Sequence, residues 1–409
     1  MPPPRKILHL DLDAFFCAVE AQRDPSLHGQ PFAVGGRPEA RGVVASCSYA
    51  ARRYGVHSAM PMAQALRLCP ELRIVSSHHR LYEAHSRQVM AHLHNFSPLV
   101  EAISIDEAFL DVSDLRASVE ALAREVQSSL WEALALPSSL GAATNKLVAK
   151  IANDVGKRAA LEQTPTTAKP VDAPMAITVV PPSSEAAFLA PLPVRALWGV
   201  GPKTAEKLSA LGIQTIGDLA RWPEDDLARR FGKIGQSLAL RARGIDNRPV
   251  VTETETQSIS REVTFAQDVS AVDELQRTLL RLTRDVGWRL RRTGLRAGTI
   301  KLKLRWSDFT TLSRQVTLES PTTQDQVILQ AAEDLLAQAW HGQPVRLIGV
   351  GLSNLQSPAT QLSLWDTGED KGQDLQQALD ALRKRYGSDV VRRASELDEG
   401  ETEGDKGTR

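Results

Sequence analysis

Two short apolar segments that carry acidic residues constrain the fold of this chain more than any other feature of its sequence. In the first, residues 7–13, aliphatic and polar residues alternate, so a β-strand would bury one face and present acids on the other. The apolar face would hold Leu8, Leu10 and Leu12, and the polar face His9, Asp11 and Asp13. The second segment, residues 103–112, contains the adjacent acids Asp106 and Glu107. These two would point to opposite faces of a straight strand, so both reach one site only at the tip of a hairpin.

Unpaired carboxylates this close together would repel each other and raise each other's pKa. Two Mg²⁺ ions about 3.5–4 Å apart would neutralise them and hold both the attacking and the leaving oxygen of a phosphoryl transfer. Solvated acids at strand ends are the alternative, and for one such segment alone they are the better interpretation. The two segments together favour Asp11, Asp106 and Glu107 as a catalytic metal site.

An aromatic pair, Phe15 and Phe16, follows the first acidic segment where the helical period resumes. An aromatic ring at this junction could touch a sugar. Two adjacent Phe residues are more often part of a hydrophobic core, because aromatic side chains dominate packing energetics.

A hydroxyl, a phenol and a guanidinium recur every three residues at Ser46, Tyr49 and Arg52. On a helix they would share about a third of the circumference. Such a donor surface suits a polyphosphate, since Arg forks onto phosphate oxygens, but a solvated helix face is the alternative.

Three lysines, Lys146, Lys150 and Lys157, are spaced to align on one face of a helix. Like charges stacked in this way destabilise an isolated helix. The stripe therefore indicates either an anionic partner or a hydrated lysine face.

These motifs, in this order and spacing, resemble the Y-family translesion DNA polymerases, in particular the bacterial members, from about residue 5 to residue 365. The sequences that carry the resemblance are Asp-Leu-Asp-Ala-Phe-Phe from residue 11, Ser-Tyr-Ala-Ala-Arg-Arg-Tyr-Gly-Val from residue 48, Ser-Ile-Asp-Glu-Ala-Phe-Leu-Asp from residue 104 and Asn-Lys-x-x-Ala-Lys-Ile-Ala from residue 145. The resemblance implies an α+β multidomain, right-hand polymerase with palm, fingers, a helical thumb with a helix-hairpin-helix, and a little finger domain.

The resemblance also implies roles for individual residues. The two Mg²⁺ ions would be held by Asp11, Asp106, Glu107 and the backbone carbonyl of Leu12, whereas Asp13 matches a residue that is not a metal ligand. The triphosphate of the dNTP would be bound by Ser46, Tyr49, Arg52 and Lys157. Phe16 falls on the steric gate, the aromatic residue that excludes a ribose 2′-hydroxyl. Val43 and Ala59 fall where the family packs on the nascent base pair, and such small residues indicate a loose, low-fidelity pocket.

One departure from the family pattern follows Lys157. The family usually continues with Pro-x-Gly, whereas this chain continues with Arg-Ala-Ala-Leu-Glu. The backbone after Lys157 must therefore differ, which puts the aim of this side chain in question.

Length and composition agree with a multidomain globular protein. The chain has 409 residues, of which 42% are hydrophobic and 24% charged, enough for three or four domains. No apolar run approaches the roughly 20 residues that cross a membrane, and the N-terminus is unlike a signal peptide. Three cysteines without metal-ligand spacing, Cys17, Cys47 and Cys69, fit a reducing compartment, so a cytoplasmic protein without membrane or zinc is expected.

The zero net charge hides an uneven distribution. Residues 366–409 contain 12 acidic and 8 basic residues, a net charge of −4, which leaves +4 on the rest of the chain. Nine basic residues against one acid lie between Arg281 and Arg305, on a predicted helix-to-strand segment. A solvated face is the usual explanation, but this ratio favours a surface that follows DNA phosphates.

The C-terminal half divides into recognisable parts. Residues 197–213 are predicted to form helix, Gly-x-Gly turn and helix, with Gly199 and Gly201 permitting positive φ, and backbone N–H groups near Lys203 would bind a DNA phosphate. From residue 258 the pattern predicts strand, helix, strand, strand, helix and strand. In its third element, Lys301, Lys303 and Arg305 alternate with aliphatic residues and would face DNA.

Past the last predicted domain, Gln361, Leu362, Leu364 and Trp365 resemble a peptide that binds the replication sliding clamp, with a Gln anchor and apolar plugs. Residues 373–394 have helical periodicity, and the last 15 or so residues are acidic, as in a disordered tail.

The sequence thus predicts a low-fidelity, translesion DNA polymerase that acts as a monomer on primer-template DNA with dNTPs. The predicted parts are palm (1–15 and 79–175), fingers (16–78), thumb (176–243), linker (244–257), little finger (258–358) and tail (359–409). Two rivals stay open: an inert accessory subunit of the same fold, which intact acids argue against, and a nonenzymatic helix-hairpin-helix protein, which leaves the acidic segments unexplained.

Overall fold

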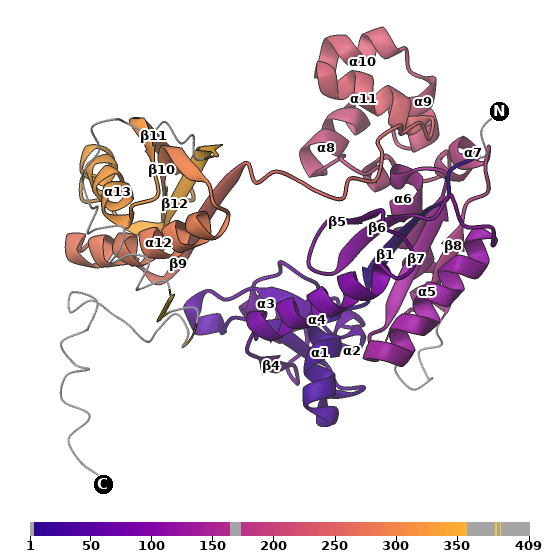
Figure 1. Cartoon of the computed structure of the whole chain (residues 1–409), viewed down its shortest axis with the longest axis horizontal. Coiled ribbons are helices and arrows are strands. Elements are labelled where there is room, and N and C mark those ends of the chain that lie inside the picture. The colour runs from indigo at the N-terminus through magenta and orange to yellow at the C-terminus, as the bar shows by residue number, and fades with distance from the viewer. Residues whose placement is uncertain (1–3, 164–172, 358–380, 383–384, 386–409) are drawn as a thin grey trace, which may run out of the picture. The chain divides into compact units, whose positions relative to one another are not determined.

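The computed structural model describes residues 4–163, 173–357, 381–382 and 385 (Figure 1). The chain forms two compact units. The first comprises Met1–Pro38 and Gly42–Thr254, and the second Glu39–Arg41 and Glu255–Arg409. Residues 358–380, which include the predicted clamp peptide, lie outside the described residues, as do most of 373–394 and the acidic end.

A five-stranded sheet with the order β5-β6-β1-β7-β8 is the centre of the first unit. Its strands are β1 Ile7–Leu12, β5 Val100–Ala102, β6 Glu107–Asp111, β7 Ser138–Ala143 and β8 Ile177–Val179. Strand β1 pairs antiparallel with both β6 and β7. The predicted strand over the first acidic segment is confirmed, and β5 and β6 form the predicted hairpin, with Asp106 in its loop and Glu107 at the start of β6.

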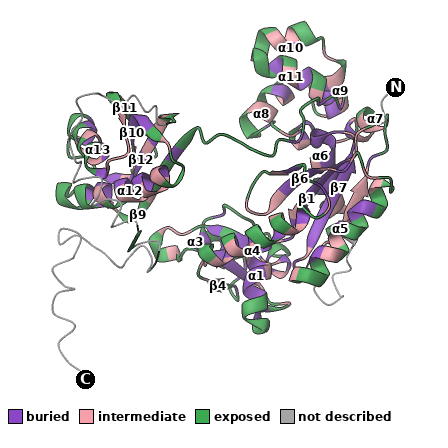
Figure 2. Cartoon of the chain, viewed as in Figure 1, coloured by how far each residue is buried: buried purple, intermediate pink, exposed green. Residues whose placement is uncertain are grey.

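Helices cover both faces of this sheet, so most of β1 is buried (Figure 2). Leu8, Leu10 and Leu12 pack against one layer of helices, which includes α1 Phe15–Arg23, α4 His79–Leu93 and α5 Val119–Leu134. On the opposite face, Ile7 and Phe109 pack against α6 Lys146–Gln163. The expectation that this face would present its polar residues is wrong for His9, which is fully buried, because α6 covers the face and leaves only its end near Asp11 open.

A smaller three-stranded sheet with the order β3-β2-β4 adjoins α1. Its elements are β2 Phe32–Gly35, β3 Val44–Cys47, β4 Arg73–Val75, α2 Tyr49–Arg52 and α3 Met62–Leu68, with short 3₁₀ turns at Pro25–Leu27 and Pro38–Ala40. A separate apolar core that includes Val44 and Met62 holds these elements together. Ser48 caps α2 through its side chain, as expected of Ser before a first helical turn.

A group of short helices follows the large sheet. It comprises α7 Glu185–Leu189, a 3₁₀ turn at Val194–Ala196, α8 Pro202–Ala210, α9 Ile216–Arg221, α10 Glu224–Phe231 and α11 Lys233–Ala242. Gly199 has a φ of 97°, as predicted, whereas Gly201 has a φ of −80° and is the N-cap of α8. Only Gly199 uses the positive φ that both glycines permit, because one left-handed residue suffices to turn the chain.

The second unit is a four-stranded antiparallel sheet with the order β11-β10-β12-β9, covered on one face by two helices. Its elements are β9 Ser258–Val269, α12 Val272–Arg292, β10 Arg296–Trp306, β11 Thr311–Thr322, α13 Asp325–Ala339 and β12 Val345–Gln356. The predicted order of strands and helices is confirmed. Alternation along β10 buries its aliphatic residues against the helices and leaves its basic residues on the open face.

Within the described residues, no helix is long and apolar enough to cross a membrane.

Candidate active site

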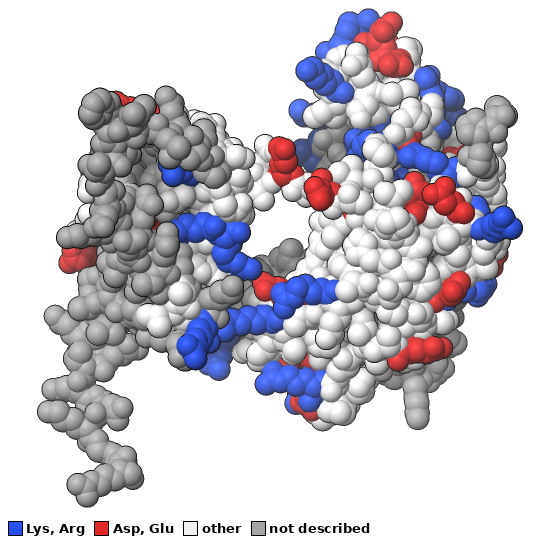
Figure 3. All heavy atoms as spheres, in the orientation of Figure 1, with Lys and Arg blue, Asp and Glu red and all other residues white. Residues whose placement is uncertain are grey.

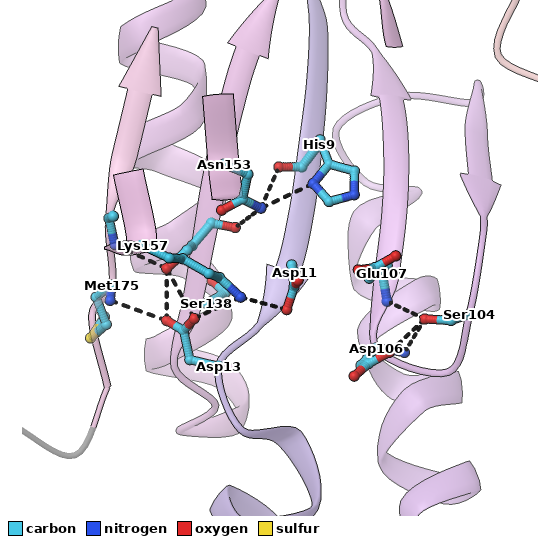
Figure 4. Close-up of polar contacts among 12 residues, drawn as sticks. His9, Asp11, Asp13, Ser104, Asp106, Glu107, Ser138, Asn153, Lys157 and Met175 are labelled. Carbon is cyan, nitrogen blue, oxygen red and sulfur yellow. Dashed lines mark hydrogen bonds and ion pairs between the residues drawn. The ribbon is translucent and has the colours of Figure 1, made fainter. Parts of the chain in front are cut away.

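The register of β1 and β6 brings the acids of the two segments together. Asp11 and Glu107 are directly paired residues of the two antiparallel strands. The N–H of Leu12 donates to the carbonyl oxygen of Asp106 at 2.9 Å, so the hairpin loop closes onto the end of β1. Figure 4 shows Asp11, Asp106 and Glu107 at this end of the sheet. The pairing is what the alternating pattern of both segments requires, since any shift by one residue would exchange their buried and polar faces.

Ser104, which sequence reasoning did not single out, organises the hairpin loop. Its hydroxyl donates to a carboxylate oxygen of Asp106 at 2.5 Å and accepts from the N–H groups of Asp106 and Glu107 at 3.3 and 3.1 Å (Figure 4). A Ser that bonds to backbone groups two and three residues on is a common turn device. The position of a Ser two residues before Asp106, at the expected hairpin turn, is the feature of the sequence that could have indicated this role.

Burial and mutual repulsion make this acidic group costly without a cation. Burial raises the pKa of Asp106 and of Glu107, and the Asp11 carboxylate adds to the rise at both. Lys150 opposes the rise at Glu107 through an ion pair of 2.9 Å. Carboxylates this close together are easier to keep ionised when a cation binds between them. Hard divalent cations prefer such oxygen ligands, so the group suits a divalent metal site.

Each of the three carboxylates has a protein partner in this structure. Asp11 pairs with Lys157 at 2.6 Å, Glu107 with Lys150, and Asp106 with Ser104. In the part of the chain that the structure describes, no three Asp, Glu, His or Cys side chains converge as a preassembled metal cluster. The three acids nevertheless fit a Mg²⁺ site, because they provide oxygen ligands on adjoining backbone segments, and Lys150 and Lys157 supply the positive charge that cations would bring.

The lysine stripe on α6 is not a hydrated face. Lys146 is 4% exposed and pairs with Glu101 at 2.7 Å, and the other two lysines pair with the acids of β1 and β6. The prediction of an anionic partner, rather than a hydrated face, is therefore the one that holds. The anions, however, are carboxylates of this chain. Asp154 of α6 also lies between Lys150 and Lys157 on this stripe, but the ion pairs of the three lysines are with acids of the neighbouring strands.

Asp13 differs from Asp11 although the two are near neighbours in sequence. Its side chain is fully buried and accepts hydrogen bonds from the Ser139 hydroxyl at 2.8 Å and from the Met175 N–H at 3.1 Å. Lys157 lies 3.0 Å from it (Figure 4). Burial raises the pKa of Asp13, and Lys157 and Ser139 oppose the rise. With its oxygens occupied by protein donors, Asp13 has the surroundings of a structural residue.

The two phenylalanines after the acids have different surroundings. Phe15 is 2% exposed and belongs to the main core. Phe16 is only partly buried, and its ring stacks on the ring of Tyr82 with centroids 4.2 Å apart and an interplanar angle of 14°. Phe16 therefore keeps a surface that a ligand could touch, whereas Phe15 does not.

The residues expected to bind a triphosphate lie close together but not on one helix. Ser46 is on β3, buried, and only Tyr49 and Arg52 belong to α2. The expectation of a single helical arc is wrong because the chain turns at Ser48, the N-cap. The Arg52 guanidinium lies 4.8 Å from the centre of the Tyr49 ring, and the Tyr49 hydroxyl donates to Asp13 at 3.5 Å. Val43, expected at the nascent base pair, is half exposed, and Ala59 has a φ of 67°.

The altered sequence after Lys157 forms helix. Helix α6 continues to Gln163, whereas the Pro-x-Gly of the family pattern would end it in a turn after Lys157. A cavity of about 420 Å³ lies between this part of α6 and the loop before α8. Its lining includes the basic side chains of Lys150, Lys157, Arg158 and Arg195, and also Gly199.

The residues expected to bind DNA lie in both units. Gly201 and Lys203 are exposed at the start of α8, but the tip of α10 carries acidic and basic side chains side by side, so charge is mixed on these helices (Figure 3). On β10, Lys301 is exposed, Lys303 pairs with Glu262 at 2.7 Å, and Arg305 bonds to Thr311.

The basic cluster of residues 281–305 is not one surface. Arg291 is 14% exposed and pairs with Asp325 at 2.7 Å, where it joins α12 to α13. Arg292 stacks on Trp288, and Arg289 pairs with Asp285. Lys301, Lys303 and Arg305 lie instead on the open face of β10, which is the candidate phosphate-binding face.

Three family profiles match the chain. The impB/mucB/samB family matches residues 10–154, its C-terminal domain residues 256–364, and the helix-hairpin-helix motif of the same family residues 182–213. A DNA polymerase IV of Dehalococcoides mccartyi (strain CBDB1) is 38% identical over 392 residues, which cover 95% of this chain and 96% of the relative. DNA polymerase IV 1 of Bacillus subtilis (strain 168) is 38% identical over 98% of this chain and 95% of its own length.

Solved structures of similar fold include a Y-family DNA polymerase chimera of Dbh and Dpo4, with a TM-score of 0.74, 25% identity, and coverage of 86% of this chain and 99% of that one. An insertion ternary complex of Dbh DNA polymerase matches with a TM-score of 0.60, the same identity and the same coverage.

Proposed function

The chain belongs to the impB/mucB/samB family of Y-family DNA polymerases, and we propose that its acids at the end of β1 and β6 carry out template-directed nucleotide addition. It is a DNA-directed DNA polymerase of the translesion type. The pairing of Asp11 with Glu107, and of Leu12 with Asp106, is the observation that supports this assignment of the site.

Y-family DNA polymerases depend on divalent metal ions. We propose two Mg²⁺ ions here, held by Asp11, Asp106, Glu107 and the carbonyl of Leu12. When bound, such ions lower the pKa of the primer 3′-hydroxyl and neutralise charge on the triphosphate.

The chain's own side chains supply the rest of the proposed reaction. The primer 3′-oxygen forms a bond to the α-phosphorus of the dNTP, and the bond to pyrophosphate breaks. Tyr49, Arg52 and Lys157 would contact the triphosphate, with Ser46 in support from β3. For this, Lys157 must exchange its carboxylate partners for phosphate oxygens, which a lysine can do because it is a flexible point charge.

The partners follow from the same proposal. Primer-template DNA would lie against the start of α8 at Gly199, Gly201 and Lys203 and against Lys301, Lys303 and Arg305 of β10. The replication sliding clamp would bind Gln361, Leu362, Leu364 and Trp365. We infer a monomer that works in the cytoplasm, where primer, template and clamp are available.

Single-nucleotide primer extension tests the proposal. With Mg²⁺ and each dNTP in turn, the protein should add the nucleotide that pairs with the template base, and it should also add one opposite a damaged base. Binding of primer-template without addition of any nucleotide would overturn the proposal and support an inert accessory subunit of the same fold.

A further inference from the structure

A buried carboxylate, Glu20, lies on α1, the helix that carries Phe16. Its side chain is 3% exposed. A carboxylate so deeply buried is costly unless donors surround it. Glu20 is one turn beyond Phe16 on α1, so the two residues lie on neighbouring positions of one helix face.

Three donors from two helices surround Glu20. The Tyr82 hydroxyl donates to Oε1 at 2.5 Å, and His78 Nδ1 lies 2.7 Å from the same oxygen. Arg23 Nη1 lies 3.5 Å from Oε2 and also contacts the His78 ring. Burial, and the bond to Glu20 after it, raise the pKa of Tyr82, so its hydroxyl stays protonated as the donor. The proposed metal site uses none of these groups.

Tyr82 connects this cluster to Phe16. Its side chain is fully buried, and its ring lies nearly parallel to the Phe16 ring. Phe15 meets Tyr82 edge to face with centroids 6.4 Å apart, and His79 packs edge-on against Phe16 at 6.1 Å. With its hydroxyl held by Glu20 and its ring held between neighbours, Tyr82 has one position, and it gives Phe16 a fixed surface to stack on.

We propose that Glu20 is a positioning residue for sugar selection, which acts through Tyr82 to hold the Phe16 ring where a ribose 2′-hydroxyl would collide with it. The proposal rests on the function proposed for Phe16. An aromatic ring excludes a ribose 2′-hydroxyl only if the ring cannot move away, because a shift of a fraction of an ångström makes room for one extra oxygen. Glu20 touches neither nucleotide nor metal in this scheme.

The test compares incorporation of rNTP and dNTP by kcat/KM. Glu20→Leu removes the acceptor for Tyr82 and should raise the rNTP to dNTP ratio by about tenfold, chiefly through faster ribonucleotide addition. Glu20→Gln keeps an acceptor oxygen and should return the ratio to within about threefold of the unmodified protein. Tyr54→Phe is the matched control, because Tyr54 donates to Glu71 at 2.7 Å in the same unit but is exposed, and its ratio should not change.

Two further variants keep the proposal falsifiable. If Glu20→Leu does not fold, Tyr82→Phe removes the same hydrogen bond while keeping the ring, and it should raise the ratio in the same direction. In a Phe16→Ala background, Glu20→Leu should add nothing to the ratio, since the group that it positions is gone.

The outcomes separate this proposal from the one on which it rests. If Phe16→Ala leaves the ratio unchanged, the gate assignment is wrong. If Phe16→Ala raises the ratio but both Glu20→Leu and Tyr82→Phe leave it unchanged, or lower the rates for both sugars equally, Glu20 serves only stability and the positioning role is refuted. An additional effect of Glu20→Leu without Phe16 would also refute it.

Discussion

Asp11 and Asp13 are separated by one residue, yet the structure predicts opposite consequences for their loss. Asp13→Ala leaves the Met175 N–H and the Ser139 hydroxyl without the acceptor that they share in the interior, and it removes one of two anions that face Lys157. Each buried donor left without a partner costs about 1–3 kcal/mol, and breaking a buried ion pair from one side costs about 3–5 kcal/mol. Since these terms overlap, we expect Asp13→Ala to lower the free energy of unfolding by about 3–5 kcal/mol.

Asp11→Asn has no such effect on stability. The Asp11 carboxylate accepts from Lys157, which keeps Asp13, and its removal relieves repulsion with Asp106 and Glu107. The free energy of unfolding should change by no more than about 1 kcal/mol, whereas nucleotide addition should be lost.

Urea denaturation followed by circular dichroism measures both variants, with primer extension on the same samples. At an m-value of about 3 kcal/mol/M, Asp13→Ala should lower the midpoint by about 1–2 M. The folded Asp13→Ala protein should still add nucleotides. Equal midpoints for Asp13→Ala and the unmodified protein, or a large loss of stability in Asp11→Asn, would refute the division of roles.

Three further predictions concern the DNA surface, the tail and the core. Reversing the charges of Lys301, Lys303 and Arg305 should weaken primer-template binding equally across sequences and flatten its salt dependence, and an unchanged salt slope would place the DNA elsewhere. Replacing Gln361, Leu362, Leu364 and Trp365 by Ala should preserve single-nucleotide addition and remove stimulation by the sliding clamp, whereas equal stimulation of both forms would make the segment a linker. Burial, and the nearby charges of Lys150 and Lys157, hold the pKa of His9 well below 6.5, so below about pH 6.5 the unfolded chain binds a proton that the native state excludes. The free energy of unfolding should therefore fall as the pH drops below about 6.5. His9→Gln should make the free energy of unfolding, measured by urea titration, depend less on pH in this range.

Local patterns in the sequence were enough to predict the strands that carry the three acids. The alternation in residues 7–13 has the period of a strand. The adjacent acids at 106 and 107 would point to opposite faces of a straight strand, so only a hairpin loop beside β1 brings both to one site. The order of elements in the second unit was predictable for the same reason, since each strand has one buried face.

Partners that come from distant segments could not be predicted. Along α6 the only acid near the stripe of Lys146, Lys150 and Lys157 is Asp154. The acids that form ion pairs with these lysines come from β1, β5 and β6, which only the folded sheet brings near. The spacing of Ser46, Tyr49 and Arg52 indicated one helix, but the helix begins only after its N-cap Ser48, so Ser46 lies on the preceding strand. No local pattern marks Glu20, because its partner Tyr82 is 62 residues away in sequence.

The assignment of Asp11, Asp106 and Glu107 as the nucleotide-addition site is tested most directly by Asp106→Asn. Single-turnover primer extension and primer-template binding would be measured on the same protein, with Asp111→Asn as a control at the far end of β6, where the side chain bonds to Ser113. We predict that Asp106→Asn lowers the rate of nucleotide addition by about a thousandfold or more while primer-template affinity stays within about threefold, and that Asp111→Asn adds nucleotides normally. Near-normal extension by Asp106→Asn would contradict the site.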